Sequence, residues 1–124
     1  PTHRIWFRRA MELKDFGCFG LTEFHHGSFN KGMETLANYD HANNQFILTS
    51  QGQKGMKFWI GGAGENATMA VIWANLIVKG ESKGPHPFIV RLRCPNTHQV
   101  LPNIHRPDKL FPEVTRPPFC RQSK

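Results

Sequence analysis

The sequence predicts a mainly β fold, preceded by a short helix and followed by an irregular, proline-rich tail. Apolar residues between positions 33 and 93 alternate or run continuously in short segments separated by turns, and six of the nine prolines lie in residues 95–124. The 124 residues, 39% of them apolar, suffice for one domain with its own core. We therefore divide the chain into residues 1–16, 17–94 and 95–124.

The N-terminal residues predict a helix over positions 3–14. Trp6, Ala10 and Leu13 are separated by steps of four and three residues, which places them on one face of a helix. Gly17 then provides a stop signal, because glycine commonly follows the last helical residue.

The middle segment reads as strands joined by turns. Strands are predicted at residues 17–22, 33–39, 45–49, 57–60, 69–78 and 86–93. The turn over residues 40–44 is rich in Asp and Asn, so its two flanking strands form a hairpin. The run 69–78 is apolar on both faces except at Asn75, and we expect both of its faces to be buried. We expect the strands to pair in antiparallel fashion.

The tail after Cys94 is expected to be irregular. Its prolines recur too closely for a helix or a central strand to form. They make no PxxP run, which weakens the alternative that the chain is an interaction module built on this tail.

The charge balance raises the possibility of an anionic partner. The chain has 16 Lys and Arg residues against 9 Asp and Glu residues, a formal net charge of +7. This excess suits a nucleic acid or an anionic small ligand. The basic residues are scattered, however, and no RNA-recognition motif with interleaved aromatics accompanies them. A nucleic-acid-binding module is therefore an alternative and not the main prediction.

Several other classes of protein are disfavoured. No apolar run approaches the roughly 20 residues of a membrane-spanning helix, and the first residues lack the layout of a secretory signal. Cys18, Cys94 and Cys120 are too few and scattered for a disulfide framework, so we expect free thiols. The adjacent His25 and His26 have no companions at ligand spacing, and we predict no metal site.

A glycine-rich segment, residues 61–64, marks a place where backbone can approach a ligand. It is not a Walker loop, because no Gly-Lys-Ser/Thr follows. It is not a dinucleotide fingerprint either, because a predicted strand follows it where that motif requires a helix. Alone, it is equally well interpreted as a tight turn between strands.

Four motifs in a fixed order carry a resemblance to a known family. They are Gly-Cys-Phe-x-x-Thr-Glu-x-x-His-Gly-Ser at 17–28, Gly-x-Glu-Thr-x-Ala-x-Tyr-Asp at 32–40, Gln-Phe-Ile-Leu-x-Ser at 45–50 and Lys-x-Trp-x-Gly-Gly-x-Gly at 57–64. Over residues 6–93 this order resembles the middle domain of the acyl-CoA oxidases, which are flavoenzymes related to the acyl-CoA dehydrogenases. The likeness ends after Arg93.

The resemblance implies an open, mostly antiparallel β-barrel, incomplete in this chain, that covers one side of the flavin ring of FAD. It places Thr22, Glu23, Trp59 and Gly61 at the cofactor. The Thr22 hydroxyl would bond the polar edge of the flavin, and a residue without a side chain at Gly61 would admit the ring. Trp59 would wall the flavin or, as an alternative, pack in the core.

The resemblance also places His26, Gly27 and Ser28 on the substrate side, near the thioester and pantetheine path. The chain departs from the family pattern at His25, where the family has glycine, and this side chain is expected to narrow the substrate path or disturb the loop. A second departure is Ile60, where proline is frequent in the family.

The parent reaction implied by the resemblance desaturates fatty acyl-CoA to trans-2-enoyl-CoA and passes the electrons to O2, giving H2O2. The implied partners are fatty acyl-CoA, the remaining helical domains and a second copy in a homodimer; neither nucleic acid nor a membrane is expected. The family's carboxylate base lies beyond the barrel, so no catalytic residue is assigned, and neither Glu23 nor Glu34 takes that role. The chain alone is expected to be inactive, and a truncated non-enzymatic product is the alternative.

The implied location is the peroxisome, the usual compartment of the family. The last three residues, Gln122 to Lys124, lack the terminal leucine of the Ser-Lys-Leu signal, so the address cannot be read from this chain.

Overall fold

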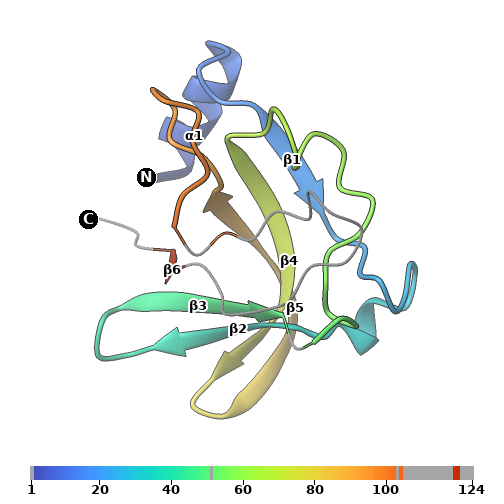
Figure 1. Cartoon of the computed structure of the whole chain (residues 1–124). Helices are drawn as coiled ribbons and strands as arrows, with labels where there is room; N and C mark the ends of the chain where they lie inside the picture. The colour runs from blue at the N-terminus through green and yellow to red at the C-terminus, as the bar shows by residue number, and fades with distance from the viewer. Residues whose placement is uncertain (1, 51, 103, 105–118, 121–124) are drawn as a thin grey trace.

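The computed structural model describes residues 2–50, 52–102, 104 and 119–120 (Figure 1). In chain order its elements are α1 (Thr2–Met11), β1 (Gly17–Gly20), the single-turn η1 (Asn30–Gly32), β2 (Thr35–Asp40), β3 (Gln45–Ser50), β4 (Met69–Val78), β5 (Glu81–Arg91) and β6 (Phe119–Cys120). One helix thus precedes a sheet that is not closed, which confirms the predicted fold class.

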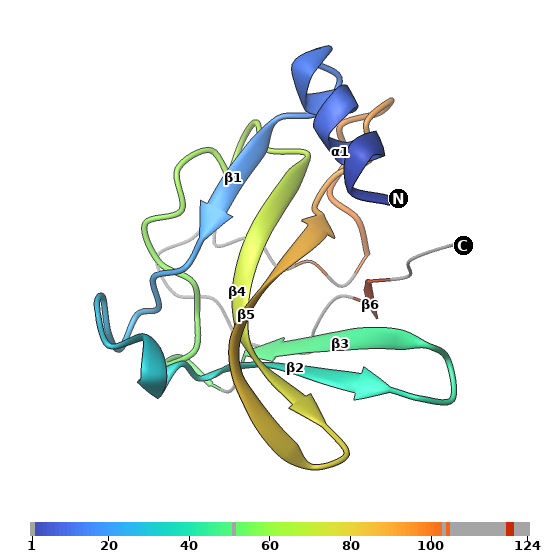
Figure 2. The ribbon, with the colours of Figure 1, turned by 180° about the vertical axis from the view of Figure 1, so that it is seen from behind.

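β4 is the central strand of the sheet (Figures 1 and 2). One of its edges pairs with β5 in antiparallel fashion from Met69 to Val78. Its other edge is shared by two short parallel neighbours, β1 opposite residues 69–72 and β2 opposite residues 75–77. β2 also pairs with β3 in the predicted antiparallel hairpin. The parallel pairs were not expected. They are possible because long connections, and not tight hairpin turns, lead from β1 to β2 and from β3 to β4.

The core is small and lies where the hairpin crosses the two long strands. Its fully buried members are Ala37, Leu48, Ala74 and Val90, against which Phe46, Ile72, Phe88 and Leu92 pack. Alanines on β4 allow the neighbouring strands and aromatic rings to approach closely. Only one face of β4 contributes fully buried side chains, so the expectation of burial on both faces is met only in part.

One predicted strand is absent, and the bounds of the others differ except for β4: β1 ends two residues early, β2 is Thr35–Asp40 where 33–39 was predicted, β3 ends one residue late, and β5 ends at Arg91, two residues early. Residues 57–60 do not form a strand, since Lys57 makes only an isolated bridge to Glu23 and Trp59 has a left-handed φ of 62°. β5 begins at residue 81, five residues earlier than predicted. The turn before it needs only Lys79 and Gly80, both with positive φ as a tight hairpin turn requires.

The ends of the chain also differ from the prediction. α1 stops at Met11, three residues early, and Leu13 has a left-handed φ of 55° that cannot continue a helix. Phe119–Cys120 pairs with β3, so the tail is not irregular throughout. Most of the predicted tail lies outside the described residues, and the division of the chain at residues 16 and 94 stays a prediction.

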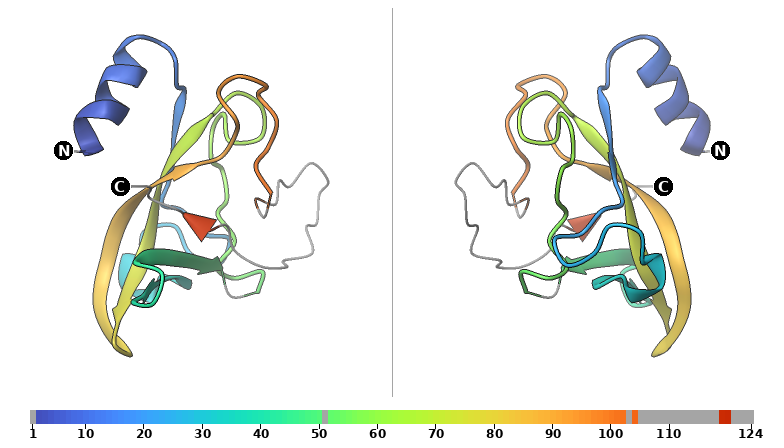
Figure 3. Two further views of the ribbon diagram at one scale, coloured as in Figure 1. Left: turned by 90° about the vertical axis from the view of Figure 1, so that its left-hand side faces the viewer. Right: turned by 90° about the vertical axis from the view of Figure 1, so that its right-hand side faces the viewer.

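Asp15 joins α1 to the sheet, beside which α1 stands in Figure 3. Its buried carboxylate accepts hydrogen bonds from Arg9 Nε at 2.6 Å, from Thr68 Oγ1 at 3.0 Å and from the guanidinium of Arg91. The Arg91 guanidinium also lies 4.5 Å from the ring centre of Trp6 on α1. Burial by itself raises the pKa of Asp15, but the bonds from Arg9, Arg91 and Thr68 outweigh it and lower the pKa to about 2.

Within the described part of the chain, no helix has the length and apolar character needed to cross a membrane. The same residues contain no cluster of three or more His, Cys, Asp or Glu side chains that could hold a metal ion. Cys18 and Cys94 are free thiols, as expected.

Candidate functional site

An open hollow of about 510 Å³ lies where the loop after β1 meets the loop that follows residue 56. It is lined by Thr22, Glu23, Phe24, His25, His26, Gly27, Phe58 and Trp59. The two loops that supply these residues are far apart in the sequence. Five of the sequence-predicted site residues thus gather at one surface, while Gly61 and Ser28 lie outside the lining.

Backbone hydrogen bonds hold the two loops together. Phe58 N donates to Thr22 O at 3.0 Å, and Phe24 N donates to Met56 O at 2.8 Å. A bridge between Glu23 and Lys57 lies between these two bonds. These contacts are made by main-chain atoms, so they do not use the side chains of Thr22 and Phe58.

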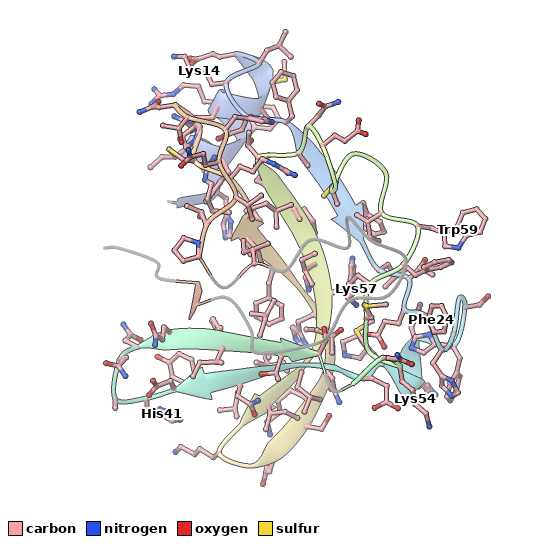
Figure 4. All side chains as sticks on the ribbon, viewed as in Figure 1. Lys14, Phe24, His41, Lys54, Lys57 and Trp59 are labelled. Atoms are coloured by element: carbon pink, nitrogen blue, oxygen red, sulfur yellow. The ribbon has the colours of Figure 1, made fainter. Side chains whose placement is uncertain are left out.

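Three aromatic side chains form the rim of the hollow. Trp59 is 83% exposed. The ring of Phe58 stands edge-on to the rings of Trp59 and Phe24, with 5.4 Å between ring centres in each pair. Figure 4 shows Phe24 and Trp59 projecting from the same side of the molecule. The alternative that Trp59 packs in the core is therefore wrong. Trp59 has a left-handed φ, which costs free energy for a residue with a side chain, and in this conformation its indole faces the solvent.

Glu23 is buried, and its carboxylate bonds to the protein interior. Oε1 accepts from Thr35 N at 2.9 Å and from Lys57 Nζ at 3.0 Å, while Oε2 accepts from Glu34 N at 2.8 Å and lies 3.1 Å from His26 Nε2. Burial raises the pKa of Glu23, but the bonds from Thr35, Glu34 and Lys57 outweigh it and lower the pKa. The Glu23 carboxylate therefore fixes the loop from the interior of the protein and cannot contact a ligand in the hollow.

Lys57 is the partner of Glu23 that sequence reasoning missed. Its Nζ donates to Glu23 Oε1, to Leu21 O at 3.1 Å and to Trp73 O on β4 at 2.7 Å. Figure 4 shows Lys57 set back from Trp59, toward β4. Burial lowers the pKa of Lys57, while Glu23 acts in the opposite direction. Lys57 is the first residue of the motif at 57–64, which was the available sign that it matters, but the spacing of residues in the sequence does not show its hydrogen-bond partners.

The histidines at the hollow differ in environment. The side chain of His26 is 9% exposed, with Nε2 toward Glu23, and its Nδ1 is buried with no hydrogen-bond partner among the described residues. His25, the departure from the family pattern, is exposed and lines the hollow, and its backbone N–H donates to Lys54 O at 3.3 Å. Ser28 is exposed beyond the lining.

The glycine-rich loop after Trp59 is held by a buried arginine. Arg93 is 2% exposed, and its guanidinium donates to Ala63 O at 3.0 Å, Gly64 O at 2.7 Å and Ala67 O at 2.5 Å. Gly61, at the start of this loop, is exposed, and a Cβ added there would meet nothing within 4 Å. Sequence reasoning assigned no role to Arg93, because nothing in its strand pattern marks a buried cation.

Comparison with known proteins gives the family. No family model matches the chain. It is 42% identical over 103 residues to human peroxisomal acyl-coenzyme A oxidase 3, and 40% identical over 99 residues to peroxisomal acyl-coenzyme A oxidase 1 of the rat. The chain is homologous to one part of the acyl-CoA oxidases. These matches span 82% and 80% of the chain but only 15% of each relative, so it corresponds to a small part of an acyl-CoA oxidase.

Solved acyl-CoA oxidase structures share the fold. Acyl-CoA oxidase-1 of Caenorhabditis elegans, complexed with FAD and ATP, superposes with a TM-score of 0.79 at 34% identity, over 82% of this chain and 16% of that one. Acyl-CoA oxidase-2 of the same organism, bound with FAD, ascaroside-CoA and ATP, gives a TM-score of 0.83 at 34% identity, over 90% and 17%. The resemblance to the acyl-CoA oxidases is thereby confirmed, and the nucleic-acid alternative is not favoured.

Proposed function

We propose that the chain supplies the flavin-covering part of an FAD-dependent acyl-CoA oxidase of peroxisomes. The observation that carries this proposal is the hollow that Thr22 and Trp59 share. The kinship with acyl-CoA oxidases supports the cofactor, because a neighbour of the same fold is complexed with FAD.

The residues at the hollow suit a flat, partly polar ligand. Among the described residues, the Thr22 hydroxyl has no hydrogen-bond partner, so it is available to a ligand. Trp59 offers an exposed aromatic face beside it, and the exposed backbone at Gly61 carries no side chain that would block an approach. These three residues would hold the flavin ring. FAD, when bound, supplies a two-electron acceptor.

Each residue then has a definite task. Thr22 donates a hydrogen bond to the polar edge of the ring and so favours negative charge there, while Trp59 covers the ring and excludes water. Glu23 contributes by fixing the loop that carries Thr22, because its carboxylate bonds the interior and its backbone N–H and carbonyl are bonded to His26. The Glu23 carboxylate is buried among its own donors and does not serve as the base that removes the substrate α proton, a role that falls to another part of the longer protein.

The substrate is fatty acyl-CoA, which the longer protein desaturates to trans-2-enoyl-CoA with reduction of O2 to H2O2. His26 and Gly27 form the side of the hollow that faces the thioester and pantetheine, and Ser28, exposed just outside the lining, extends that side. The remaining helical domains complete the site, so the chain alone is inactive, and the full-length protein forms a homodimer.

Flavin titration of the purified chain tests the proposal. We expect FAD to bind weakly and to quench the tryptophan fluorescence of the chain, with Thr22→Ala weakening binding about tenfold, as the loss of one neutral hydrogen bond of up to about 1.5 kcal/mol predicts. Thr22→Ser, which keeps the hydroxyl, should bind normally, and so should Thr97→Ala, which removes a threonine outside the hollow. Equal affinities of the wild type and Thr22→Ala, or no binding at all, would contradict the proposal.

A further inference from the structure

The edge of β4 that faces the hollow has a gap in its strand pairing. β1 pairs with β4 up to Ile72, and β2 takes over only at Asn75. The Trp73 carbonyl lies in this gap and accepts a hydrogen bond from Lys57 Nζ at 2.7 Å. A side-chain ammonium therefore occupies the place where a neighbouring strand would otherwise donate.

The same ammonium reaches the loop that carries Thr22. Its other two acceptors are Leu21 O at 3.1 Å and Glu23 Oε1 at 3.0 Å, the residues immediately before and after Thr22. The Lys57 side chain is 13% exposed and that of Glu23 is fully buried, so water competes little for these bonds. Glu23 in turn bonds Thr35 N at the start of β2.

Lysine suits this position because its ammonium has three donors and no acceptor, and three carbonyl or carboxylate oxygens surround it. A buried ion pair is weak evidence for stability, since its desolvation cost offsets its attraction. What the pair gains is a fixed geometry, because Lys57 also bonds Leu21 O and β4, and Glu23 also bonds the backbone at the start of β2.

We propose that Lys57 and Glu23 form a buried clamp that sets the spacing of the two loops of the hollow, and that Lys57 is a positioning residue for Thr22 and Trp59. Lys57 precedes Phe58, whose N–H binds Thr22 O, so a shift of Lys57 moves both walls. The effect on flavin affinity rests on the proposed function, whereas the loop geometry does not.

Hydrogen exchange of the purified chain tests the clamp directly. The double variant Glu23→Gln/Lys57→Met removes both charges and leaves neither unpaired. We expect the amides of Phe24 and Phe58, which donate across the two loops, to exchange at least about tenfold faster, while the β5 amide of Val90 keeps its protection. Unchanged protection of Phe24 and Phe58 would overturn the proposal.

The exposed pair of Glu81 and Lys83, at 2.6 Å, supplies a matched control. Glu81→Gln/Lys83→Met removes the same two charges and should alter neither amide. Lys57→Arg supplies a second test if the double variant fails to fold. It keeps the charge, but its planar fork cannot serve three acceptors placed for an ammonium, so the Phe24 and Phe58 amides should still lose protection; normal protection would refute the clamp.

Flavin titration separates the two proposals. If the wild type binds FAD, the double variant should bind at least about tenfold more weakly although its core is folded. If the wild type binds no FAD, the proposed function fails while the exchange result still decides the clamp. Retained affinity in the double variant, with loosened loops, would refute the positioning role.

Discussion

Replacement of Asp15 by asparagine tests how α1 is held to the sheet. The carboxylate is 3% exposed and bonds Arg9, Thr68 and Arg91, which together lower its pKa from 3.8 to about 2. At about 1.4 kcal/mol per pKa unit, this shift corresponds to roughly 2.5 kcal/mol of stability. The substitution Asp15→Asn would keep the size of the side chain but remove the charge that both guanidinium groups face.

The sign of the pH dependence follows from the lowered pKa. The stabilisation is present above the unfolded pKa of 3.8 and is lost as the pH falls through the folded pKa of about 2. We expect the wild type to exceed Asp15→Asn by roughly 2.5 kcal/mol at pH 7, and this difference to fall to about half at pH 3.

Urea unfolding followed by circular dichroism between pH 7 and pH 3 measures this difference. Glu81→Gln serves as the control, because its carboxylate belongs to a highly exposed pair with Lys83 and such pairs contribute little. A difference between wild type and Asp15→Asn that stays constant over the pH range would refute the electrostatic account. An equal change with pH in the difference in unfolding free energy between wild type and Glu81→Gln would also refute it.

Three further predictions concern the glycine-rich loop and the thiols. Arg93→Met should lower the free energy of unfolding by about 3 kcal/mol in urea, because three carbonyls lose a charged donor; a loss below about 1 kcal/mol would contradict this. Gly62→Ala should cost about 1 kcal/mol in the same assay, since φ is +78° there. Iodoacetamide at neutral pH should modify Cys94 faster than Cys18 by peptide mapping, because Thr97 lowers the pKa of Cys94 and burial raises that of Cys18; equal rates would contradict it.

Local patterns predicted the hairpin and the central strand. The turn over residues 40–44 carries its own chemistry, with Asp40 accepting from Ala42 N at 2.9 Å, and the run Met69–Val78 is long and apolar enough to be unambiguous. The type and approximate place of these elements needed no information from distant residues, although β2 begins two residues later than predicted.

The parts that failed depend on contacts between distant segments. The parallel neighbours of β4 are set by where long loops return, which no local pattern encodes. Residues 57–60 have the pattern of a strand, but Lys57 forms an ion pair with Glu23, 34 positions away, and the Trp59 side chain is exposed to solvent. The family motifs correctly brought Thr22 and Trp59 together, whereas the contact of Gly61 with a ligand stays a prediction.

The two short parallel neighbours of β4 have a consequence for how this fold opens. The hairpin β2–β3 is bonded to the central strand only through residues 36–38, whereas β4 and β5 are paired from end to end. The hairpin is therefore the piece that can detach while the long pair stays intact, as a sub-global opening unit with its own free energy. Glu23, bonded to Thr35 where β2 begins, ties the rim of the hollow to that more loosely attached piece.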